Sequence, residues 1–173
     1  MRLVTYGAAC SLDGYIAGPG HEVDWLKWSE DVAALTNALW DRIDTVLMGR
    51  RTYEVAVSSG LTAYPGVQNI VFSRSLKPAE WPDVTIVSDD PATYVRNLKA
   101  EAGGEICVMG GGLIAKELLA ADLIDEIGVN VQPLILGGGV SLLPPGGRQV
   151  QLILKESRVL EGGCVYALYK VSR

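Results

Sequence analysis

Apolar and polar positions follow two different patterns along the chain, and the change falls about two-thirds of the way through the sequence. Up to about residue 121, short apolar runs alternate with stretches in which apolar residues recur at helical spacing. Beyond that point, apolar runs are separated only by turn sequences such as PLILGGG and PPGG. The first pattern is typical of parallel strands joined by crossover helices, and the second of antiparallel strands at a sheet edge.

These patterns predict about eight strands and roughly four flanking helices. The strands are expected at residues 3–10, 45–48, 69–72, 84–87, 105–109, 125–132, 150–156 and 163–171. The helices are expected at residues 29–42, 51–59, 91–102 and 113–121. Ser29 can cap the first helix, and Asp90 followed by Pro91 marks the start of the third. The prediction is one α/β domain over residues 1–173, with a mixed, mostly parallel sheet and antiparallel C-terminal strands.

Composition and charge narrow the classes of function. The chain has 173 residues, of which 49% are apolar and 20% charged, as in an ordinary globular domain. No apolar stretch reaches the roughly 18 residues that span a bilayer, and the N-terminus lacks a secretory signal. A cytoplasmic location without a membrane partner is therefore expected. The net charge of −5, with no basic cluster, argues against a nucleic-acid partner.

The cysteine and histidine content argues against a metal site. Cys10, Cys107 and Cys164 lie in or beside apolar runs and are far apart in sequence, so we expect small buried core residues. His21 is the single histidine. A zinc site of the usual Cys/His type cannot be built from this set, and we predict no metal.

Two strand-to-helix turns carry candidate binding chemistry. In VLMGRRTYE (residues 46–54) and in VMGGGLI (residues 108–114), an apolar strand ends at Met-Gly and a helix begins at once. A helix N-terminus offers unpaired N–H groups and a partial positive charge, which favour an anion. In the first turn, Arg50, Arg51 and Thr52 add further donors. The alternative is that the glycines only make tight turns and that the arginines are solvated.

The position of these turns favours a dinucleotide. Ligands of open α/β sheets bind beyond the carboxyl ends of the strands, where both turns would lie. Two anion sites at one edge suit a molecule with separated phosphates. A third stretch, VFSRS (residues 71–75), offers Ser73 and Arg74 for the 2′-phosphate that distinguishes NADP from NAD. The spacing of Gly110, Gly112 and Ala115 matches the Rossmann fingerprint, but it comes too late in the chain to serve as one.

The stretches SLDGYIAGP, VDWL, LMGRRTYE, VFSRSL and VMGGGLIAKELL, in this order, resemble the dihydrofolate reductase superfamily. More closely, they resemble stand-alone proteins related to the C-terminal reductase domain of the bifunctional riboflavin biosynthesis deaminase-reductase. The resemblance covers essentially the whole chain. It implies a three-layer dihydrofolate reductase-like fold, NADPH as hydride donor, a small-molecule substrate and assembly as a homodimer.

The resemblance also implies which residues bind the cofactor. They belong to the end of the first strand, the loop after it, the two glycine turns and the VFSRS stretch. They are Ala9, Ile16, Ala17, Gly49, Arg50, Arg51, Thr52, Ser73, Arg74, Gly110, Gly111, Gly112, Leu113 and Ile114. In dihydrofolate reductases a cis peptide bond joins the first two glycines of the second turn, and the resemblance implies one here.

The substrate side has fewer candidates. Asp13 belongs to the SLDG loop, and Trp25 and Tyr53 can form walls for a flat substrate, although such aromatic residues also pack in cores. The resemblance implies a carboxylate on the first helix as proton donor, and Asp31 fits this role best. Asp24 and Glu30 are alternatives, and ordinary compensation of the helix dipole is another explanation for Asp31.

Two positions depart from the riboflavin-reductase pattern. Such reductases typically carry lysine where this chain has Gly7, and an acid where it has Met109. The first hypothesis is therefore an NADPH-dependent reductase of a pterin-like or pyrimidine-like molecule, with the substrate left open. The second is an NADP(H)-binding protein without efficient catalysis, acting as a sensor or interaction module.

Overall fold

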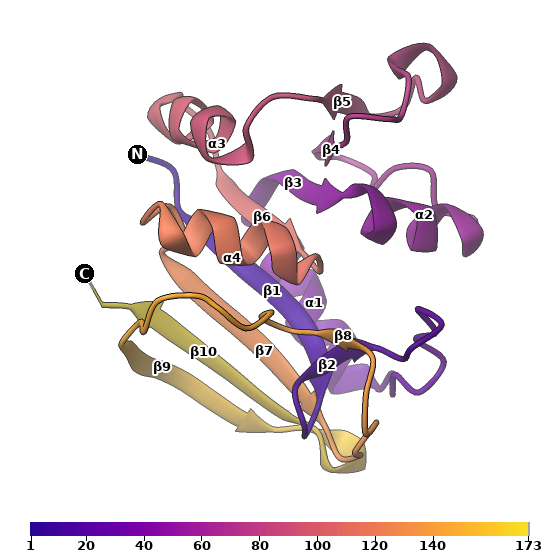
Figure 1. Cartoon of the computed structure of the whole chain (residues 1–173). Helices are drawn as coiled ribbons and strands as arrows, with labels where there is room; N and C mark the ends of the chain where they lie inside the picture. The colour runs from indigo at the N-terminus through magenta and orange to yellow at the C-terminus, as the bar shows by residue number, and fades with distance from the viewer. Residues whose placement is uncertain (173) are drawn as a thin grey trace.

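A single eight-stranded sheet forms the centre of the protein (Figure 1). The computed structural model describes residues 1–172. From one edge of the sheet to the other, the strands are β5 (Thr85–Val87), β4 (Gln68–Phe72), β3 (Ile43–Gly49), β6 (Glu105–Met109), β1 (Val4–Ser11), β7 (Glu126–Gln132), β10 (Val165–Val171) and β9 (Leu152–Val159).

The connections between strands explain their directions. All neighbouring pairs from β5 to β7 are parallel, because crossover segments return the chain to the same end of the sheet. Helix α4 (Gly112–Ala120) is the last of these crossovers, so β7 is still parallel to β1. β10 is antiparallel to β7, and β9 is antiparallel to β10. Antiparallel pairing at one edge, near the C-terminus, is confirmed.

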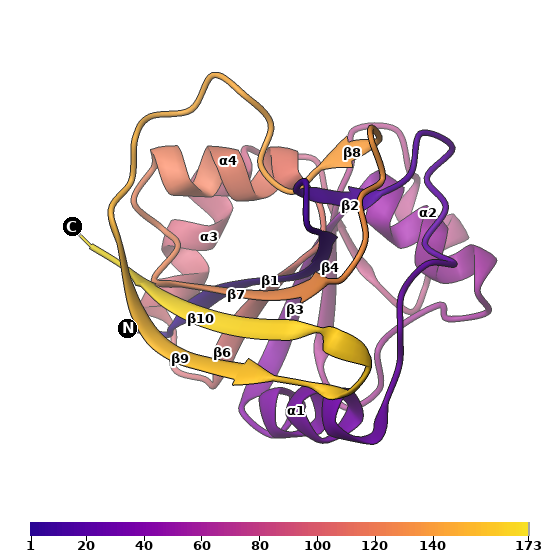
Figure 2. The same ribbon diagram turned by 90° about the horizontal axis from the view of Figure 1, so that it is seen from below.

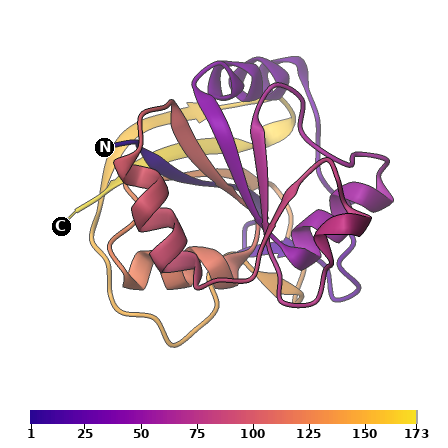
Figure 3. The same cartoon turned by 90° about the horizontal axis from the view of Figure 1, so that it is seen from above.

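Helices cover both faces of the sheet. Helix α1 (Glu30–Trp40) lies on one face, while α3 (Pro91–Ala100) and α4 lie on the other (Figure 2). Figure 3 shows the same three layers from the opposite side. Helix α2 (Arg50–Ser58) starts directly where β3 ends and projects beyond the sheet. Across residues 1–172, no helix combines the length and apolar character that crossing a membrane requires.

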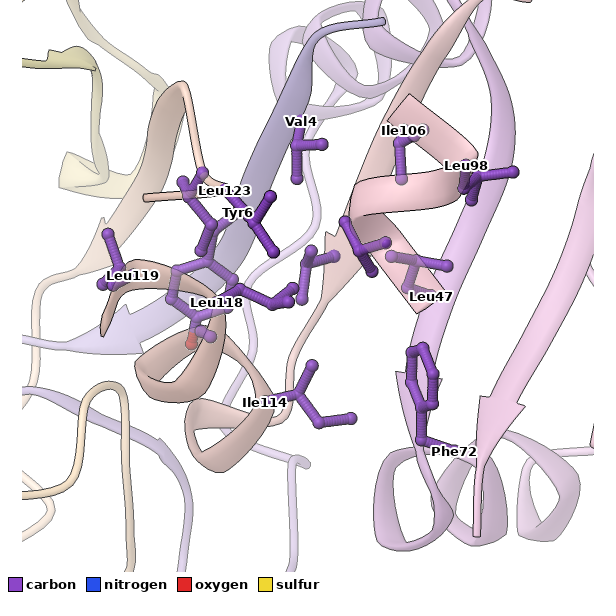
Figure 4. Close-up of a cluster of buried hydrophobic side chains, with 14 of the residues drawn as sticks. Val4, Tyr6, Leu47, Phe72, Leu98, Ile106, Ile114, Leu118, Leu119 and Leu123 are labelled. Carbon is purple, nitrogen blue, oxygen red and sulfur yellow. The ribbon is translucent and has the colours of Figure 1, made fainter. Parts of the chain in front are cut away.

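The larger core lies between the sheet and helices α3 and α4. Val4 and Tyr6 from β1 and Leu47 from β3 pack there against Ile114 and Leu118 from α4 (Figure 4). These side chains are buried, and each strand contributes every second residue, as the pleat of a strand requires. This packing fixes α4, and with it the glycine turn that precedes the helix.

The opposite face of the strands forms a second core beneath α1 and α2. Val46 and Met48 of β3 and Cys107 of β6 are buried there beside Tyr53. All of Cys10, Cys107 and Cys164 are buried and unbridged, as predicted. Helix α2 is therefore tied to the sheet in two ways, directly through the end of β3 and through Tyr53 in this core.

The sequence predicted the four helices and eight sheet strands close to their observed bounds. It missed the short pair β2 (Tyr15–Ala17) and β8 (Val140–Ser141), and the turns η1 (Pro78–Glu80) and η2 (Glu161–Gly163). Such short segments are set by contacts between distant loops and have no periodic signal. Asp90 caps α3 as expected, since its carboxylate accepts a 2.8 Å hydrogen bond from Thr93 N–H. Ser29 occupies the N-cap of α1, but its side chain caps no backbone group.

Candidate active site

A cavity of about 1000 Å³ lies beyond the carboxyl ends of the parallel strands. Every residue that the sequence assigned to the cofactor lines it, from the end of β1, the loop after it, both glycine turns and the stretch after β4. Those residues are Ala9, Ile16, Ala17, Gly49, Arg50, Arg51, Thr52, Ser73, Arg74, Gly110, Gly111, Gly112, Leu113 and Ile114. The fold thus places five separate stretches of sequence around one space.

The two glycine turns face each other across this cavity, because β3 and β6 are neighbours in the sheet. A Cβ atom on Gly111 would lie 3.5 Å from Thr52 Oγ1 and 3.8 Å from the backbone nitrogen of Gly49. Neither helix start has a side-chain cap. Two sets of uncapped backbone N–H groups and the Thr52 hydroxyl therefore converge, which is an arrangement that suits phosphate groups.

Glycine is required in the second turn for two different reasons. Gly110 and Gly111 have φ values of 56° and 63°, in the left-handed region. At Gly112, a Cβ atom would lie 2.5 Å from the Leu142 carbonyl oxygen and 2.7 Å from that of Ser141, so the chain after β7 packs directly on the start of α4. The prediction of a cis bond between Gly110 and Gly111 is wrong, since every peptide bond in residues 1–172 is trans.

Arg50 links the first turn to the loop after β4. Its Nε donates a 2.6 Å hydrogen bond to Glu54 Oε1, and its Nη1 donates a 2.8 Å hydrogen bond to Ser75 Oγ. Ser73 Oγ accepts a hydrogen bond from the Ser75 N–H, which folds this loop into a tight turn. The guanidinium of Arg50 and the adjacent Arg74 therefore border the same part of the cavity.

The acids Asp89 and Glu117 line the cavity together with Arg74. Burial raises the pKa of Glu117, the Asp90 side chain raises it further through a hydrogen bond and its charge, and Arg74 lowers it. Asp89 follows β5 at the edge of the sheet, so these acids lie away from the end of β1.

Asp31 does not line the cavity and does not have the surroundings of a proton donor. Its Oδ1 accepts hydrogen bonds from Ser29 Oγ (2.5 Å) and Val32 N–H (2.8 Å), and its Oδ2 accepts one from Glu161 N–H at 2.7 Å. The pKa of Asp31 is lowered most by the hydrogen bond from Ser29 and next by the hydrogen bond from Glu161. The carboxylate joins the start of α1 to the η2 turn, and these contacts favour a structural role for Asp31 over the catalytic one. Glu30 and Asp24 also lie outside the lining.

The three substrate candidates are also outside this cavity. Asp13 accepts hydrogen bonds from the N–H groups of Leu136 (3.0 Å) and Gly137 (2.8 Å), which tie two loops together. Trp25 Nε1 donates to a carbonyl oxygen within its own loop. Tyr53 is 1% exposed and packs edge-on against Trp81 in the second core. Local sequence could not separate these packing roles from substrate contacts.

Much of the remaining wall of the cavity was not predicted from sequence. Gly7 and Met109, noted only as departures from a pattern, line it. One group of unpredicted residues comes from the loop before α1, the second half of α2 and the loop after it. This group is His21, Val23, Leu26, Val55, Ala56, Ser59, Leu61 and Tyr64. These residues share only their position on α2 and its flanking loops, which fold over the edge of the sheet. No local sequence motif predicts this arrangement.

Comparison with known families agrees with this geometry. The sequence pattern of the RibD C-terminal domain matches residues 2–166. The chain belongs to this family. The uncharacterised Bacillus subtilis (strain 168) protein YwjB is 31% identical over 152 residues, which cover 87% of each chain. The family resemblance that the motifs predicted is confirmed.

Solved structures place the RibD C-terminal domain protein in a wider fold. A candidate riboflavin biosynthesis protein from Shewanella sp. PV-4 is 26% identical and superimposes with a TM-score of 0.85 over 99% of this chain and 100% of that one. The Thermotoga maritima deaminase/5-amino-6-(5-phosphoribosylamino)uracil reductase and the Enterococcus faecalis dihydrofolate reductase, in complex with NADP(H), each give 0.71 at 18% identity. Each match covers 99% of this chain, together with 57% of the Thermotoga maritima chain and 97% of the Enterococcus faecalis chain. The fold is that of dihydrofolate reductase, as predicted.

Proposed function

We propose that this RibD C-terminal domain protein is a reductase that uses NADPH to reduce a small molecule. The observation that supports this most strongly is the convergence of two uncapped helix starts and of Arg50, Arg51 and Arg74 on one cavity. Such a set of donors matches a ligand with several phosphates. The relatives with reductase names agree with this assignment.

The residues present fit the cofactor. The N–H groups after Gly49 and Gly111, with Thr52, would hold the pyrophosphate, and Arg50, Ser73 and Arg74 would hold the 2′-phosphate. Ala9, Ile16 and Ala17 would border the nicotinamide, because they lie where the end of β1 and the following loop meet the cavity. When bound, NADPH supplies a hydride, and the protein must orient the acceptor beside it and exclude water.

The residues on the substrate side give weaker support to the proposal that this protein catalyses the same reactions as the named relatives. At Gly7 and Met109 the chain lacks the lysine and acid that the resemblance implies for a phosphoribosylamino-pyrimidine substrate. These departures also favour the second candidate function, an NADP(H)-binding protein without efficient catalysis. Assembly as a homodimer stays a prediction.

A screen for NADPH oxidation separates the two functions. Wild-type protein is mixed with NADPH and, in turn, with dihydrofolate, with 5-amino-6-(5-phosphoribosylamino)uracil and with a set of uncharged carbonyl compounds. Substrate-dependent loss of nicotinamide absorbance is expected with at least one compound. Cofactor binding without oxidation in every mixture would favour the sensor or interaction module, and absence of NADPH binding would refute both.

A further inference from the structure

The part of the cavity around the ends of β1 and β6 and the second half of α2 has a distinctive composition. Because a helix rises ~1.5 Å per residue, Val55 and Ala56 lie roughly 8 Å beyond the first residue of α2. The lining residues of this region are Gly7, Ala9, Val23, Leu26, Val55, Ala56, Ser59, Leu61, Tyr64 and Met109. None of them carries a charge, and Ser59 and Tyr64 have the only side-chain hydroxyl groups among them. We refer to this region as the apolar half of the cavity.

Tyr64 is held in this wall more firmly than an ordinary loop residue. Asn69 of β4 is 5% exposed, and its side chain binds the Tyr64 backbone from both sides. Asn69 Oδ1 accepts a 2.9 Å hydrogen bond from Tyr64 N–H, and Asn69 Nδ2 donates a 2.8 Å hydrogen bond to the Tyr64 carbonyl oxygen. Trp40 stacks on the tyrosine ring with the ring centres 5.1 Å apart. A buried amide and an aromatic neighbour therefore fix the ring.

The surroundings of the Tyr64 hydroxyl keep it protonated. Burial raises the pKa of this hydroxyl, and the nearby Cys107 thiol raises it further. Burial, with a smaller effect of Glu105, also raises the pKa of Cys107 to about 12, so the thiol is neutral at physiological pH. The Cys107 sulfur lies 3.7 Å from the point where a Cβ atom of Gly7 would stand. Cys107 thus lies near both Tyr64 and Gly7, the position at which the resemblance implies a lysine.

We propose that Tyr64 is the proton donor of this site and that the apolar half of the cavity takes an uncharged carbonyl compound. The proposal rests on the proposed reductase function. In the step, the carbonyl carbon gains the hydride that NADPH supplies, the π electrons of the C=O bond move to oxygen, and that oxygen takes the Tyr64 proton. The products are an alcohol, NADP⁺ and a Tyr64 phenolate, which regains its proton from water.

The chemistry of the lining favours this class of substrate. A phosphate or carboxylate on the substrate would be desolvated among apolar side chains, which is costly. The nearby cation, Arg51 beside Val23 and Val55, is assigned to the cofactor phosphates. Reduction of a carbonyl group generates an alkoxide, which is far more basic than a phenolate. A protonated phenol can therefore complete the reaction even with its pKa raised, whereas an iminium substrate already carries its proton.

The other groups in the cavity are less suitable donors. Ser59 Oγ already donates a 3.2 Å hydrogen bond to the Val55 carbonyl oxygen. His21 lines the cavity from a glycine-rich loop, and no hydrogen bond among the described residues holds its ring. Glu117 lies close enough to Arg74 for that charge to lower its pKa, and Asp89 follows β5 at the edge of the sheet, so neither carboxylate belongs to the apolar half. Only Tyr64 combines a fixed position with a protonated hydroxyl.

The test compares Tyr64→Phe with Tyr53→Phe. Tyr53 lies in the same core, its hydroxyl has no hydrogen-bond partner, and it does not line the cavity. Each variant therefore loses one phenolic oxygen, but only one of them loses it at the proposed site. The substrate probes are acetophenone, which is uncharged, and 4-acetylbenzoate, which adds a carboxylate to the same ketone. Single-turnover hydride transfer and the NADPH dissociation constant are measured for each protein.

We expect wild type to reduce acetophenone at least tenfold faster than 4-acetylbenzoate. Tyr64→Phe should lower the hydride-transfer rate about 100-fold or more, because general acid catalysis contributes roughly 10²–10⁴-fold. Its NADPH dissociation constant should stay within about threefold of wild type, and Tyr53→Phe should match wild type throughout. Full turnover by Tyr64→Phe, an equal loss in Tyr53→Phe, or preference for the carboxylate would overturn the proposal. Normal NADPH binding without reduction of either ketone would overturn it as well, whereas absence of NADPH binding would refute the reductase function itself.

Discussion

Replacement of Gly111 by alanine tests the phosphate cradle with a single methyl group. The Cβ atom would stand between the two helix starts, 3.5 Å from Thr52 Oγ1 and 3.8 Å from the Gly49 nitrogen. These distances are ordinary van der Waals contacts, so the methyl group fits the protein without a ligand. It would, however, fill the space that a phosphate oxygen needs in order to reach the backbone N–H groups.

Two magnitudes determine the expected result. An alanine in the left-handed region, where Gly111 has φ 63°, costs about 1–2 kcal/mol. This is small beside a typical folding free energy of about 5–15 kcal/mol, so the variant should remain folded. Loss of one charge-assisted hydrogen bond to phosphate costs about 1.5–3 kcal/mol, which weakens binding roughly 10-fold to 150-fold.

Gly137→Ala provides the matched control. Gly137 has φ +75° and open space where its Cβ atom would be, and it lies outside the cavity. Calorimetric titration with NADPH and urea unfolding are performed on both variants and on wild type. The two variants should lose similar stability, but only Gly111→Ala should lose affinity. Unchanged affinity of Gly111→Ala, or an equal loss in the control, would show that no phosphate approaches this turn.

Two further substitutions distinguish the cofactor residues from the structural acid. Arg74→Gln should weaken NADPH binding about tenfold or more and leave NADH binding unchanged, because a contact with the 2′-phosphate is lost. Parallel titrations with the two dinucleotides measure this, and equal losses of affinity for both would exclude that contact. Asp31→Asn should leave NADPH affinity and hydride transfer unchanged but destabilise the fold. Because the pKa of Asp31 is lowered in the folded state, its contribution is fully present above the unfolded pKa and is lost as pH falls through the lower folded value. Urea unfolding at neutral and acidic pH should therefore show the difference from wild type shrinking in acid, and a constant difference would contradict the role of the charged carboxylate.

The glycine turns of the cavity could be predicted from sequence because their chemistry is local. Gly49 and Arg50 are adjacent in the chain, as are Gly110 and Gly111, and each group carries its own signal at a strand-to-helix turn. Parallel pairing then places both turns at one edge of the sheet. The alternation of strands and helices predicted that both turns lie at the carboxyl edge of the sheet, but it did not predict that β3 and β6 are neighbours.

The substrate side could not be predicted because its residues depend on tertiary contacts. Tyr64 lies outside any segment with a periodic pattern of apolar residues. Its position depends on Asn69 and Trp40, which belong to different elements. Asp31 is a carboxylate at the start of the first helix, as expected of a catalytic acid. However, its hydrogen bond from Glu161 N–H joins residues far apart in sequence. Only folded coordinates distinguish such a structural acid from a catalytic one.

The most direct measurement is the affinity of wild-type protein for NADPH and NADH, determined by calorimetric titration at one salt concentration. Arg50, Arg74 and Ser73 border the same part of the cavity, so the 2′-phosphate should gain at least one charge-assisted hydrogen bond. NADPH should therefore bind with one molecule per chain and at least about tenfold more tightly than NADH. Absence of NADPH binding, or equal dissociation constants for the two dinucleotides, would contradict the assignment of this cavity to NADPH.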